Sequence, residues 1–367
     1  MTVVGAPSFP HVVVMAGGTG GHVFPALAVA RVLLARGCSV SWLGTRQGIE
    51  ARLVPAAGIP VDWLDISGLR GKGWQGWLVA PWRLGKAVAQ ALAALRSRRP
   101  AVVLGLGGFV AGPGGLAARL AGIPLVVHEQ NAIAGLTNRS LARLAQRVLA
   151  AFPTAFPVGR ATVTGNPVRA EISALPAPAE RFAAREGVAR VFVFGGSQGA
   201  LAINRLLPAA LGLLPPGLRP TVLHQAGRGD ERVAAVRAAY AAGGIVADVR
   251  EFVEDMAAEY AAADLVVCRA GALTIAELAA AGVGAVLLPL STAVDDHQTA
   301  NAAWLVSAGA AVRIDERGLT AAALGAQLEQ ILATGREGWL RMAEAARGCA
   351  ITDAAEQVAD ICLEEAR

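Results

Sequence analysis

The sequence predicts an α/β protein built from two doubly wound parallel-sheet domains, and three observations support this fold class. The chain has 367 residues, enough for two domains at about 100–200 residues each. It is 54% hydrophobic and 17% charged, which favours large cores and excludes an intrinsically disordered chain. Short apolar runs alternate with helical stretches in both halves, as expected for parallel sheets with right-handed crossovers.

Each half begins with a strand that enters a glycine-rich turn. In the first half the predicted strands are residues 11–16, 39–44, 101–105 and 124–129. The turn GGTGGH at 17–22 precedes a stretch with helical apolar spacing that ends at Gly37. In the second half the predicted strands are residues 189–195, 220–225, 264–268 and 285–290, and a helical stretch follows GGSQGA. The proline-rich segment 167–180 is the best candidate for a linker, and a cleft is expected between the two domains.

Several classes of protein are excluded by composition. The four cysteines are far apart and form no CxxC pair, which argues against a disulfide framework or a zinc site and fits a reducing cytoplasm. Residues 1–30 and 100–118 lack charge. The first segment lacks the basic start of a signal peptide, and the second contains glycines and a proline that would expose backbone to lipid. No transmembrane helix is therefore predicted.

The net charge of +5 hides an uneven distribution. Residues 66–170 carry +12, whereas residues 171–367 carry −8, so the two domains are expected to face different partners. No nucleic-acid-binding motif accompanies the basic half, and nucleic acid is not expected as a partner. Trp74, Trp77, Leu78 and Trp82 lie among Arg70, Lys72, Arg83 and Lys86. Tryptophan with basic side chains favours the surface of an anionic membrane, although core packing of the tryptophans stays open.

Three glycine-rich turns could bind phosphate. They are GGTGGH at 17–22, GGFVAGPGG at 107–115 and GGSQGA at 195–200. Such turns direct free amides and a helix dipole at a ligand, and Thr19 and Ser197 add hydroxyls, although plain tight turns also use glycine. The dinucleotide pattern fails at Val23 and at Ser197, and neither lysine of the chain lies in a P-loop. A sugar nucleotide stays open as the ligand.

A further candidate site follows the strand at 264–268. Amides in the segment 269–274 could hold a diphosphate, and Glu277 could bind a ribose diol, although it could also be a first-turn partner of the helix dipole. The segment Asp295-Asp296-His297-Gln298 is interpreted as a helix start with an aspartate cap rather than a metal site. Gln298 would then be free to bind a sugar.

The ordered motifs GGTGGHVFPALAVA, SGLRGKG, GLGGFVAGPGG, HEQNAIAGLTNR, GNPVR, GGSQGA and RAGALTIAEL resemble those of the MurG family. The resemblance spans nearly the whole chain. It implies the N-acetylglucosaminyltransferase that converts lipid I to lipid II in peptidoglycan synthesis, with the GT-B architecture of two Rossmann-like domains. Residues 1–168 and a final helix at about 350–367 would bind the acceptor lipid I and the membrane. Residues 169–349 would bind UDP-N-acetylglucosamine.

The resemblance also implies roles for individual residues. The positions that it assigns to the donor are Thr19, Gly20, Gly21, Asn131, Arg169, Ser197, Val253, Ala272, Leu273, Thr274, Ile275, Ala276, Glu277 and Gln298. The acceptor diphosphate is assigned to Gly17, Gly18, Gly107, Gly108, Gly114 and Gly115. The family commonly has tyrosine where this chain has Phe109, so a hydroxyl-dependent role at that position is absent or unnecessary here.

The expected chemistry is an inverting transfer of N-acetylglucosamine to the C4 hydroxyl of the acceptor, with a β-1,4 product. His22 is the preferred general base, and Glu129 and His128 are the alternatives. No cofactor is expected and metal is dispensable, because no DxD-type motif stands near the donor turns. The expected location is the cytoplasmic face of the inner membrane, as a peripheral protein. Two other functions stay open: a UDP-N-acetylglucosamine epimerase and a non-enzymatic, membrane-docked sugar-nucleotide sensor.

Overall fold

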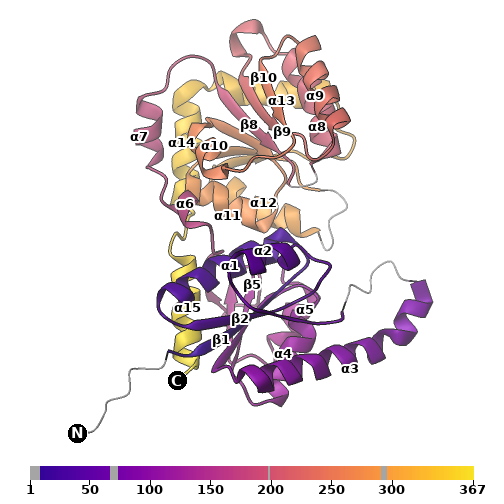
Figure 1. The fold of residues 1–367 in the computed structure, drawn as a ribbon. Helices are drawn as coiled ribbons and strands as arrows, with labels where there is room; N and C mark the ends of the chain where they lie inside the picture. Colours follow the sequence, from indigo (N-terminus) through magenta and orange to yellow (C-terminus); the bar gives the residue numbers. More distant parts are fainter. Residues whose placement is uncertain (1–8, 67–72, 197–198, 291–295) are drawn as a thin grey trace. The chain divides into compact units, whose positions relative to one another are not determined.

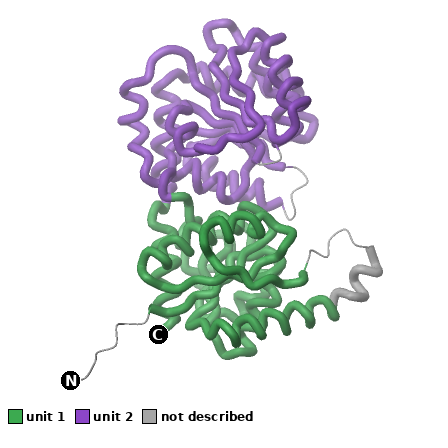
Figure 2. The backbone as a smooth tube through the Cα atoms, viewed as in Figure 1, with its two compact units in different colours: residues 1–169, 351–367 green, residues 170–350 purple. Residues whose placement is uncertain are grey.

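The chain folds into two compact units, each built around a parallel sheet. The structure is a computed structural model that describes residues 9–66, 73–196, 199–290 and 296–367, with the backbone alone for residues 73–80. Unit 1 comprises Met1–Arg169 and Ile351–Arg367, and unit 2 comprises Ala170–Ala350 (Figure 2). The boundaries expected from the sequence, at 168/169 and about 349/350, lie one residue away.

Unit 1 contains a seven-stranded sheet in the order β3-β2-β1-β4-β5-β6-β7 (Figure 1). Every adjacent pair is parallel. Its strands are β1 (His11–Ala16), β2 (Ser39–Gly44), β3 (Val61–Trp63), β4 (Val102–Gly107), β5 (Leu125–Glu129), β6 (Arg147–Ala150) and β7 (Thr162–Val163). The four strands expected from the sequence are β1, β2, β4 and β5, which form the apolar centre of the sheet.

Helices cover both faces of this sheet. The helices of unit 1 are α1 (Gly20–Ala35), α2 (Glu50–Ala56), α3 (Gly73–Arg98), α4 (Ala111–Leu120), α5 (Leu136–Leu141) and α15 (Ala354–Glu365). On one face, α1 and the C-terminal helix α15 pack on Val12, Val14 and Leu104. On the other face, α3, α4 and α5 pack on Val13, Met15 and neighbouring strand residues. The alternation of buried side chains along β1 therefore supplies two separate cores.

Unit 2 repeats this architecture with six parallel strands in the order β10-β9-β8-β11-β12-β13. The strands are β8 (Arg190–Phe194), β9 (Thr221–Gln225), β10 (Ala247–Arg250), β11 (Leu265–Cys268), β12 (Gly284–Leu287) and β13 (Ala311–Arg313). The helices are α6 (Ala170–Ser173), α7 (Pro178–Ala183), α8 (Leu201–Gly212), η1 (Pro216–Leu218), α9 (Asp230–Ala242), α10 (Met256–Ala262), α11 (Ala272–Ala281), α12 (His297–Ser307), α13 (Ala321–Ala333) and α14 (Gly335–Gly348). Helices α8, α9 and α13 pack on one face of the sheet.

The predicted linker at 167–180 is wrong for most of its length. Residues from Ala170 onward belong to unit 2, where α6 and α7 bury Ile172, Pro178 and Phe182. The prolines of this segment do not mark a linker, because one of them, Pro178, begins a helix. At that position a backbone N–H would have no intrahelical partner, so proline loses no hydrogen bond.

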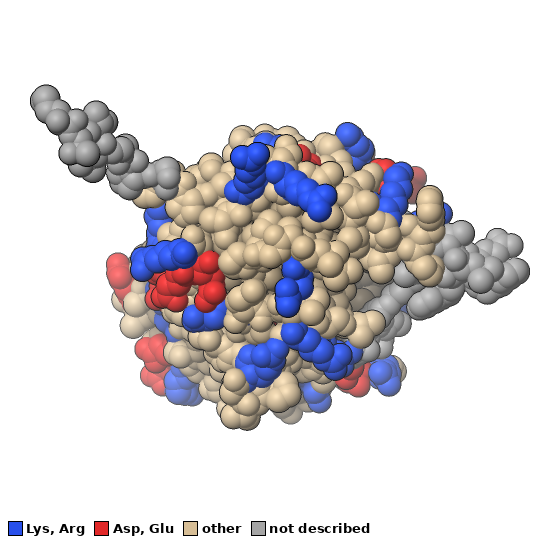
Figure 3. Space-filling model, turned by 90° about the horizontal axis from the view of Figure 1, so that it is seen from below, with Lys and Arg blue, Asp and Glu red and all other residues tan. Residues whose placement is uncertain are grey.

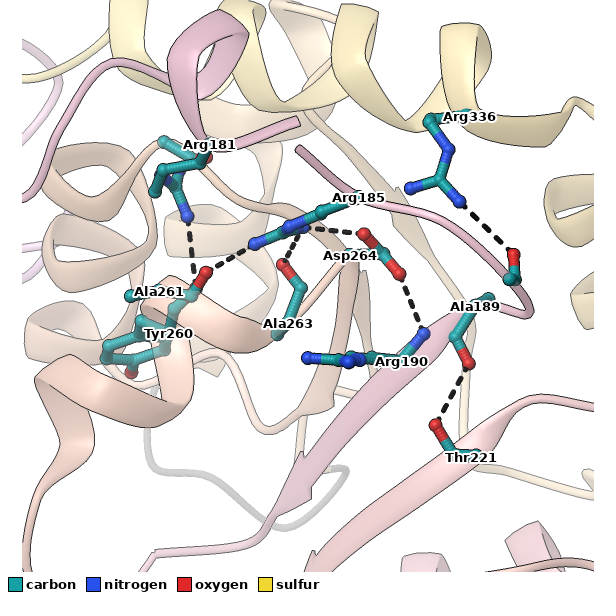
Figure 4. Close-up of polar contacts among 12 residues, drawn as sticks. Arg181, Arg185, Ala189, Arg190, Thr221, Tyr260, Ala261, Ala263, Asp264 and Arg336 are labelled. Carbon is teal, nitrogen blue, oxygen red and sulfur yellow. Dashed lines mark hydrogen bonds and ion pairs between the residues drawn. The ribbon is translucent and has the colours of Figure 1, made fainter. Parts of the chain in front are cut away.

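A largely buried group of charged residues joins α7 and the segment after it to the start of β8 and β11 (Figure 4). Arg185 donates to a carboxylate oxygen of Asp264 at 2.6 Å and to the carbonyl of Ala263 at 2.8 Å. The other carboxylate oxygen of Asp264 accepts the backbone N–H of Arg190 at 2.8 Å. Arg181 donates to the carbonyl of Tyr260 at 3.2 Å. The guanidinium groups thus satisfy carbonyls at the end of α10, where a helix leaves its last carbonyls unpaired.

Among the described residues, no helix is long and apolar enough to cross a membrane. All four cysteines are free thiols, and Cys38, Cys268 and Cys362 are buried.

Candidate functional site

The strand order fixes where ligands can bind in each unit. Connections run to opposite sides of β1 and β4 in unit 1, and of β8 and β11 in unit 2. Ligands of doubly wound sheets bind outside the carboxyl ends of strands at such a switch point. The turns that follow these four strands contain Gly17–His22, Gly107–Phe109, Gly195–Ala200 and Arg269–Thr274. Three glycine-rich segments and the RAGALT segment found in the sequence therefore lie at the two switch points.

A buried carboxylate holds the first glycine turn of unit 1. Glu50, with 0% exposure, accepts the N–H of Gly18 at 2.9 Å. Its other oxygen accepts the N–H of Thr45 at 3.1 Å and the Thr45 hydroxyl at 2.7 Å. A Cβ on Gly48 would lie 1.9 Å from Glu50 Oε2, so that glycine makes room for the carboxylate. No motif of the sequence indicates this role of Glu50, because two of its three hydrogen bonds come from backbone amides.

The turn continues directly into helix α1. Thr19 is the N-cap residue and makes no side-chain capping bond, so its hydroxyl is not used by the helix. The N–H groups of His22 and Val23 bond to the carbonyl of Thr19. Gly20 and Gly21 form the first helical positions, where amides lack intrahelical acceptors. These two amides fit the anion-binding role expected of the turn.

The glycines of the segment 107–115 differ in their positions, and two of them do not fit the predicted binding of the acceptor diphosphate. Gly108 has φ +81°, and a Cβ there would lie 2.2 Å from the carbonyl oxygen of Gly17, so the two turns are in contact. Gly114 and Gly115, in contrast, are buried inside α4. A Cβ on Gly114 would lie 2.2 Å from Met15 Sδ, and one on Gly115 would lie 2.6 Å from Leu141. These two glycines allow close packing of α4 and are wrong as ligands of a diphosphate.

A chain of hydrogen bonds leads from His22 into the core of unit 1. His22 Nδ1 lies 2.8 Å from Gln130 Oε1. Gln130 Nε2 lies 3.0 Å from His128 Nδ1 and also bonds to the His128 carbonyl. His128 Nε2 lies 2.9 Å from the carbonyl oxygen of Gly165. Burial lowers the pKa of His128 to about 4, so its ring is neutral at pH 7.

Glu129 organises the loop after β5 through both carboxylate oxygens. Oε1 accepts the backbone N–H of Asn131 at 2.9 Å and its side-chain amide at 3.1 Å. Oε2 accepts the Asn138 amide at 2.8 Å and the N–H of Gly135 at 3.2 Å. Glu129 is 1% exposed. This carboxylate is therefore built into the loop, which does not suit a general base.

The glycine turn after β8 in unit 2 is closed by backbone contacts. The N–H of Gly199 bonds to the carbonyl of Gly196 at 2.9 Å. A Cβ on Gly199 would lie 2.2 Å from the carbonyl oxygen of Ala226. Asn204 of α8 donates to that carbonyl at 2.8 Å and lies 3.1 Å from His224 Nε2. Ser197, assigned to the donor from the sequence, lies outside the described residues.

Helix α11 presents its N-terminus at the carboxyl end of β11. The first intrahelical bond runs from the N–H of Ile275 to the carbonyl of Gly271, so Ala272, Leu273 and Thr274 are the positions whose amides precede it. Ile275 and Ala276 lie within the helical ladder, and Ile275 is 1% exposed. Their amides are therefore already used within the helix, and the assignment of these two residues to the donor stays a prediction.

Glu277 lies in the second turn of α11, so the first-turn alternative is wrong. Its side chain is buried at 5% exposure and accepts the Tyr260 hydroxyl at 3.2 Å. Tyr260 in turn packs edge-on against Phe192 and Phe194 from the face of the sheet opposite α8. A carboxylate oriented in this way can still offer acceptor positions to a diol, because each oxygen has two lone pairs.

The other assigned donor residues differ in their surroundings. Val253 is 3% exposed, so only its backbone could meet a ligand. The side-chain oxygen of Gln298 is not free, because it accepts the N–H of Leu290 at 2.9 Å; binding of a sugar through its NH₂ group stays a prediction. Asp296 occupies the N-cap of α12 as expected, but its carboxylate accepts the Thr299 hydroxyl at 2.7 Å rather than a backbone amide. Asp295 lies outside the described residues. Arg169 lies with its guanidinium 6.0 Å from the ring of Phe24.

The tryptophan segment falls at the start of α3. The side chains of Trp74, Trp77 and Leu78 lie outside the described residues, as do Arg70 and Lys72. Trp82 is 78% exposed, and Arg83 and Lys86 are also exposed. Lys86 pairs with Asp65 at 2.8 Å, and this ion pair lowers the pKa of Asp65. Core packing is therefore wrong for Trp82.

Exposed apolar groups continue onto the helices that neighbour α3. Helix α4 packs on α3, and α5 packs on α4. Their surface includes the exposed apolar side chains Leu116, Leu120 and Leu136 and the exposed basic side chains Arg119, Arg139 and Arg143. Seen from below, Lys and Arg side chains are spread widely over the surface, whereas Asp and Glu gather mainly toward one side (Figure 3). In the part of the chain that is described, no three His, Cys, Asp or Glu side chains converge on a metal position.

Both halves of the chain match a known protein family. Residues 12–150 match the glycosyltransferase family 28 N-terminal domain, and residues 190–358 match the glycosyltransferase family 28 C-terminal domain. A protein of Halorhodospira halophila is 58% identical over 97% of this chain and 98% of its own length. A protein of Alkalilimnicola ehrlichii is 55% identical over 97% of this chain and 99% of its own length. Both are named UDP-N-acetylglucosamine–N-acetylmuramyl-(pentapeptide) pyrophosphoryl-undecaprenol N-acetylglucosamine transferase.

Solved structures show the same arrangement of elements. The crystal structure of MurG from Acinetobacter baumannii matches with a TM-score of 0.85 and 42% identity, over 97% of this chain and 99% of that one. A UDP-N-acetylglucosamine 2-epimerase from Neisseria meningitidis matches with a TM-score of 0.67, over 96% and 99%, but with only 14% identity. The second likeness shows a shared fold alone.

Proposed function

Because this chain belongs to glycosyltransferase family 28, we propose that it transfers N-acetylglucosamine from UDP-N-acetylglucosamine to lipid I. The bond formed joins the donor's anomeric carbon to the C4 hydroxyl of the N-acetylmuramoyl-pentapeptide, and the product is lipid II with a β-1,4 linkage. The observation that carries this proposal is 58% identity, over 97% of the chain, to a protein named as that transferase. The epimerase shares only the fold.

We assign the donor mainly to the switch point of unit 2. Amides of Ala272, Leu273 and Thr274 at the start of α11, with the turn at Gly195–Ala200, would hold the diphosphate. Glu277, already oriented by Tyr260, would accept hydrogen bonds from the ribose hydroxyls. Backbone of Val253 would meet the uracil. In unit 1, Arg169, Asn131 and the Thr19–Gly21 turn are the remaining positions assigned to the donor.

The acceptor diphosphate fits the first turns of unit 1. Gly17, Gly18, Gly107 and Gly108 lie where the two turns are in close contact, because a Cβ on Gly108 would lie 2.2 Å from the carbonyl oxygen of Gly17. Gly20 and Gly21 add amides at the positive end of α1. Gly114 and Gly115 are no longer part of this assignment, because they lie inside α4.

His22 is the general base that this geometry supports best. It is only partly buried and one ring nitrogen is held by Gln130, whereas His128 and Glu129 are enclosed and fully engaged. The base would remove the proton of the C4 hydroxyl as that oxygen attacks the anomeric carbon, and UDP would leave from the opposite face. Inversion of an α-linked donor gives the β-linked product. Helix N-termini and Arg169 would stabilise the charge on the leaving diphosphate without a metal ion or cofactor.

The decisive experiment supplies UDP-[¹⁴C]N-acetylglucosamine with a lipid I analogue in the presence of EDTA. We expect radioactive, β-linked lipid product. Conversion of the nucleotide sugar without an acceptor would instead identify an epimerase. Saturable donor binding with neither reaction would favour the sensor and contradict the transferase.

We further propose that unit 1 attaches peripherally to an anionic membrane surface on the cytoplasmic side. Exposed Trp82, Leu116 and Leu120 would enter the interface, and basic side chains such as Arg83 would contribute roughly 1 kcal/mol each near anionic lipid. Sedimentation with phosphatidylglycerol vesicles should weaken in the Trp82→Ser/Leu120→Ser variant. Leu213→Ser, at an exposed position of unit 2, is the matched control. Equal sedimentation of both variants would contradict the proposed surface.

A further inference from the structure

The hydrogen bonds that join His22 to Gln130, His128 and Gly165 can have only one arrangement of donors and acceptors. The hydrogen-bond chain begins at the carbonyl oxygen of Gly165, which can only accept. His128 Nε2, 2.9 Å away, must therefore carry the proton. Since the buried His128 ring is neutral, its Nδ1 has a bare lone pair and needs a donor.

That requirement orients the side chain of Gln130. Two acceptors face the same end of its amide: His128 Nδ1 and the His128 carbonyl oxygen, each 3.0 Å from Nε2. If the Gln130 amide were flipped, its oxygen would face the lone pairs of both acceptors. This repulsion would be costly, because Gln130 is 1% exposed and His128 is 0% exposed. The NH₂ group therefore points to His128, and Oε1 points to His22.

The orientation of Gln130 in turn decides which nitrogen of His22 is protonated. Oε1 can only accept, so His22 Nδ1, 2.8 Å away, donates. The neutral ring then has its lone pair on Nε2, and no hydrogen bond to Nε2 occurs among the described residues. Gly107 leaves room for this ring, because a Cβ at that position would lie 3.0 Å from its Cε1 and Nδ1.

We propose that Gln130 is a positioning residue that transmits the hydrogen-bond direction set by Gly165 and His128, and so makes His22 Nε2 a proton acceptor. The inference deepens the proposed function and rests on it only for the role of His22 in transfer. The tautomer itself is a property of the chain without substrates.

The direct test is ¹⁵N NMR of the full-length chain labelled at its five histidines, with His22→Asn used to identify the His22 signals. We expect the Nδ1–H tautomer for His22 near neutral pH. Gln130→Leu should give a mixture of tautomers. His128→Leu, which removes the anchor without touching His22, should do the same. The matched control is Gln146→Leu, because Gln146 directly precedes β6 of the same unit and its side-chain oxygen accepts the N–H of Leu125; it should leave the tautomer unchanged.

Kinetics give an independent readout. Gln130→Leu should lower kcat by roughly 10–100-fold and shift the acid side of the pH profile, while the KM for UDP-N-acetylglucosamine changes by less than about threefold. An Nε2–H tautomer in the unmodified chain overturns the inference, as does an Nδ1–H tautomer that persists in Gln130→Leu. If the chain transfers no sugar but the tautomer behaves as expected, the proposed function fails and the hydrogen-bond chain stands.

Discussion

The first glycine turns of the two units have the same place in the fold but are held in different ways. In unit 1, side chains hold the turn: Glu50 accepts the Gly18 amide, and Gln130 bonds to His22. In unit 2, the contacts of the described part of the turn join backbone atoms, with Gly199 against the carbonyl of Ala226. The buried ion pair of unit 2, Arg185 with Asp264, lies at the other end of the strands.

The polar residues near His22 in unit 1 suit proton transfer, whereas the Arg185–Asp264 pair in unit 2 suits stabilisation of the fold. Polar groups at the carboxyl ends of the unit 1 strands can orient and move protons, because one of them, His22, is partly open to solvent. The Arg185–Asp264 pair of unit 2 is enclosed, with side chains 12% and 2% exposed, and Arg185 also donates to the carbonyl of Ala263 at the end of α10. We therefore expect substitutions along the hydrogen-bond chain of His22, Gln130 and His128 to change the chemistry, and substitution of Arg185 to change the stability of unit 2.

The largest expected effect on stability is at Arg185. Arg185→Leu leaves Asp264 as an unpaired buried charge and should cost unit 2 about 3–5 kcal/mol of unfolding free energy. Hydrogen exchange of amides in β8 and β11 measures this loss. Arg250→Leu is the matched control, since its ion pairs with Asp248 and Glu259 are exposed and are worth less than about 1 kcal/mol. Equal protection in both variants would show that the buried pair is not a stabilising element.

Acid should weaken both units through one buried histidine each. Burial lowers the pKa of His128 in unit 1 and of His224 in unit 2 from 6.5 to about 4. Between those values the unfolded chain binds more protons, so stability is complete above pH 6.5 and falls as the pH drops toward 4. At pH 5 the loss is about 2 kcal/mol per unit.

Urea unfolding followed at the indole NMR signals of Trp42 and Trp339, buried in units 1 and 2 respectively, separates the two effects. His224→Leu should remove the acid sensitivity of unit 2 and leave that of unit 1 unchanged. If the acid sensitivity of unit 2 persists in this variant, it has another origin.

Glu50→Gln tests whether a carboxylate is needed at the first turn of unit 1. An amide can replace only one of the two accepting oxygens, so either Gly18 or Thr45 would face an NH₂ group. A buried, unsatisfied N–H costs about 1–3 kcal/mol, and hydrogen exchange in β1 and β2 should show a loss in that range. Asp255→Asn is the control, because Asp255 accepts one exposed amide. No difference between the variants would mean that the turn does not depend on Glu50.

The sequence predicted the centre of each sheet better than its edges. Strands β1, β4 and β8 are largely apolar runs that lead directly into glycine, and β11 is an apolar run that reaches Gly271 after two residues, so their type and their turns could be predicted. The edge strands β3, β7 and β13 have two or three residues and exist only because a neighbour pairs with them. The assignment of Gly114 and Gly115 to the acceptor diphosphate is wrong because the sequence does not distinguish a glycine of a turn from a helical glycine. In α4 these glycines allow close packing against Met15 and Leu141.

The candidate site shows the same limit. His22 and Glu277 could be selected from their places after strands, but Glu50, Gln130 and Tyr260 could not. Each acts on a residue at least 17 positions away, and such pairings arise only when the sheet assembles. Residues that orient a functional side chain are thus the part of a site that is hardest to predict from a single sequence.

The smallest effect is expected at Phe109, where the family commonly has tyrosine. Phe109 is 52% exposed and lies beside Gly18, so a hydroxyl added by Phe109→Tyr would remain in water and bury no polar group. The hydrogen bonds that direct His22 run beneath the turn and do not include this ring. We therefore expect kcat/KM for lipid I analogue to stay within about twofold, or roughly 0.4 kcal/mol. A gain of tenfold or more would show that the exposed side of the turn also contributes to the chemistry, and that the buried hydrogen-bond chain is only part of what distinguishes unit 1.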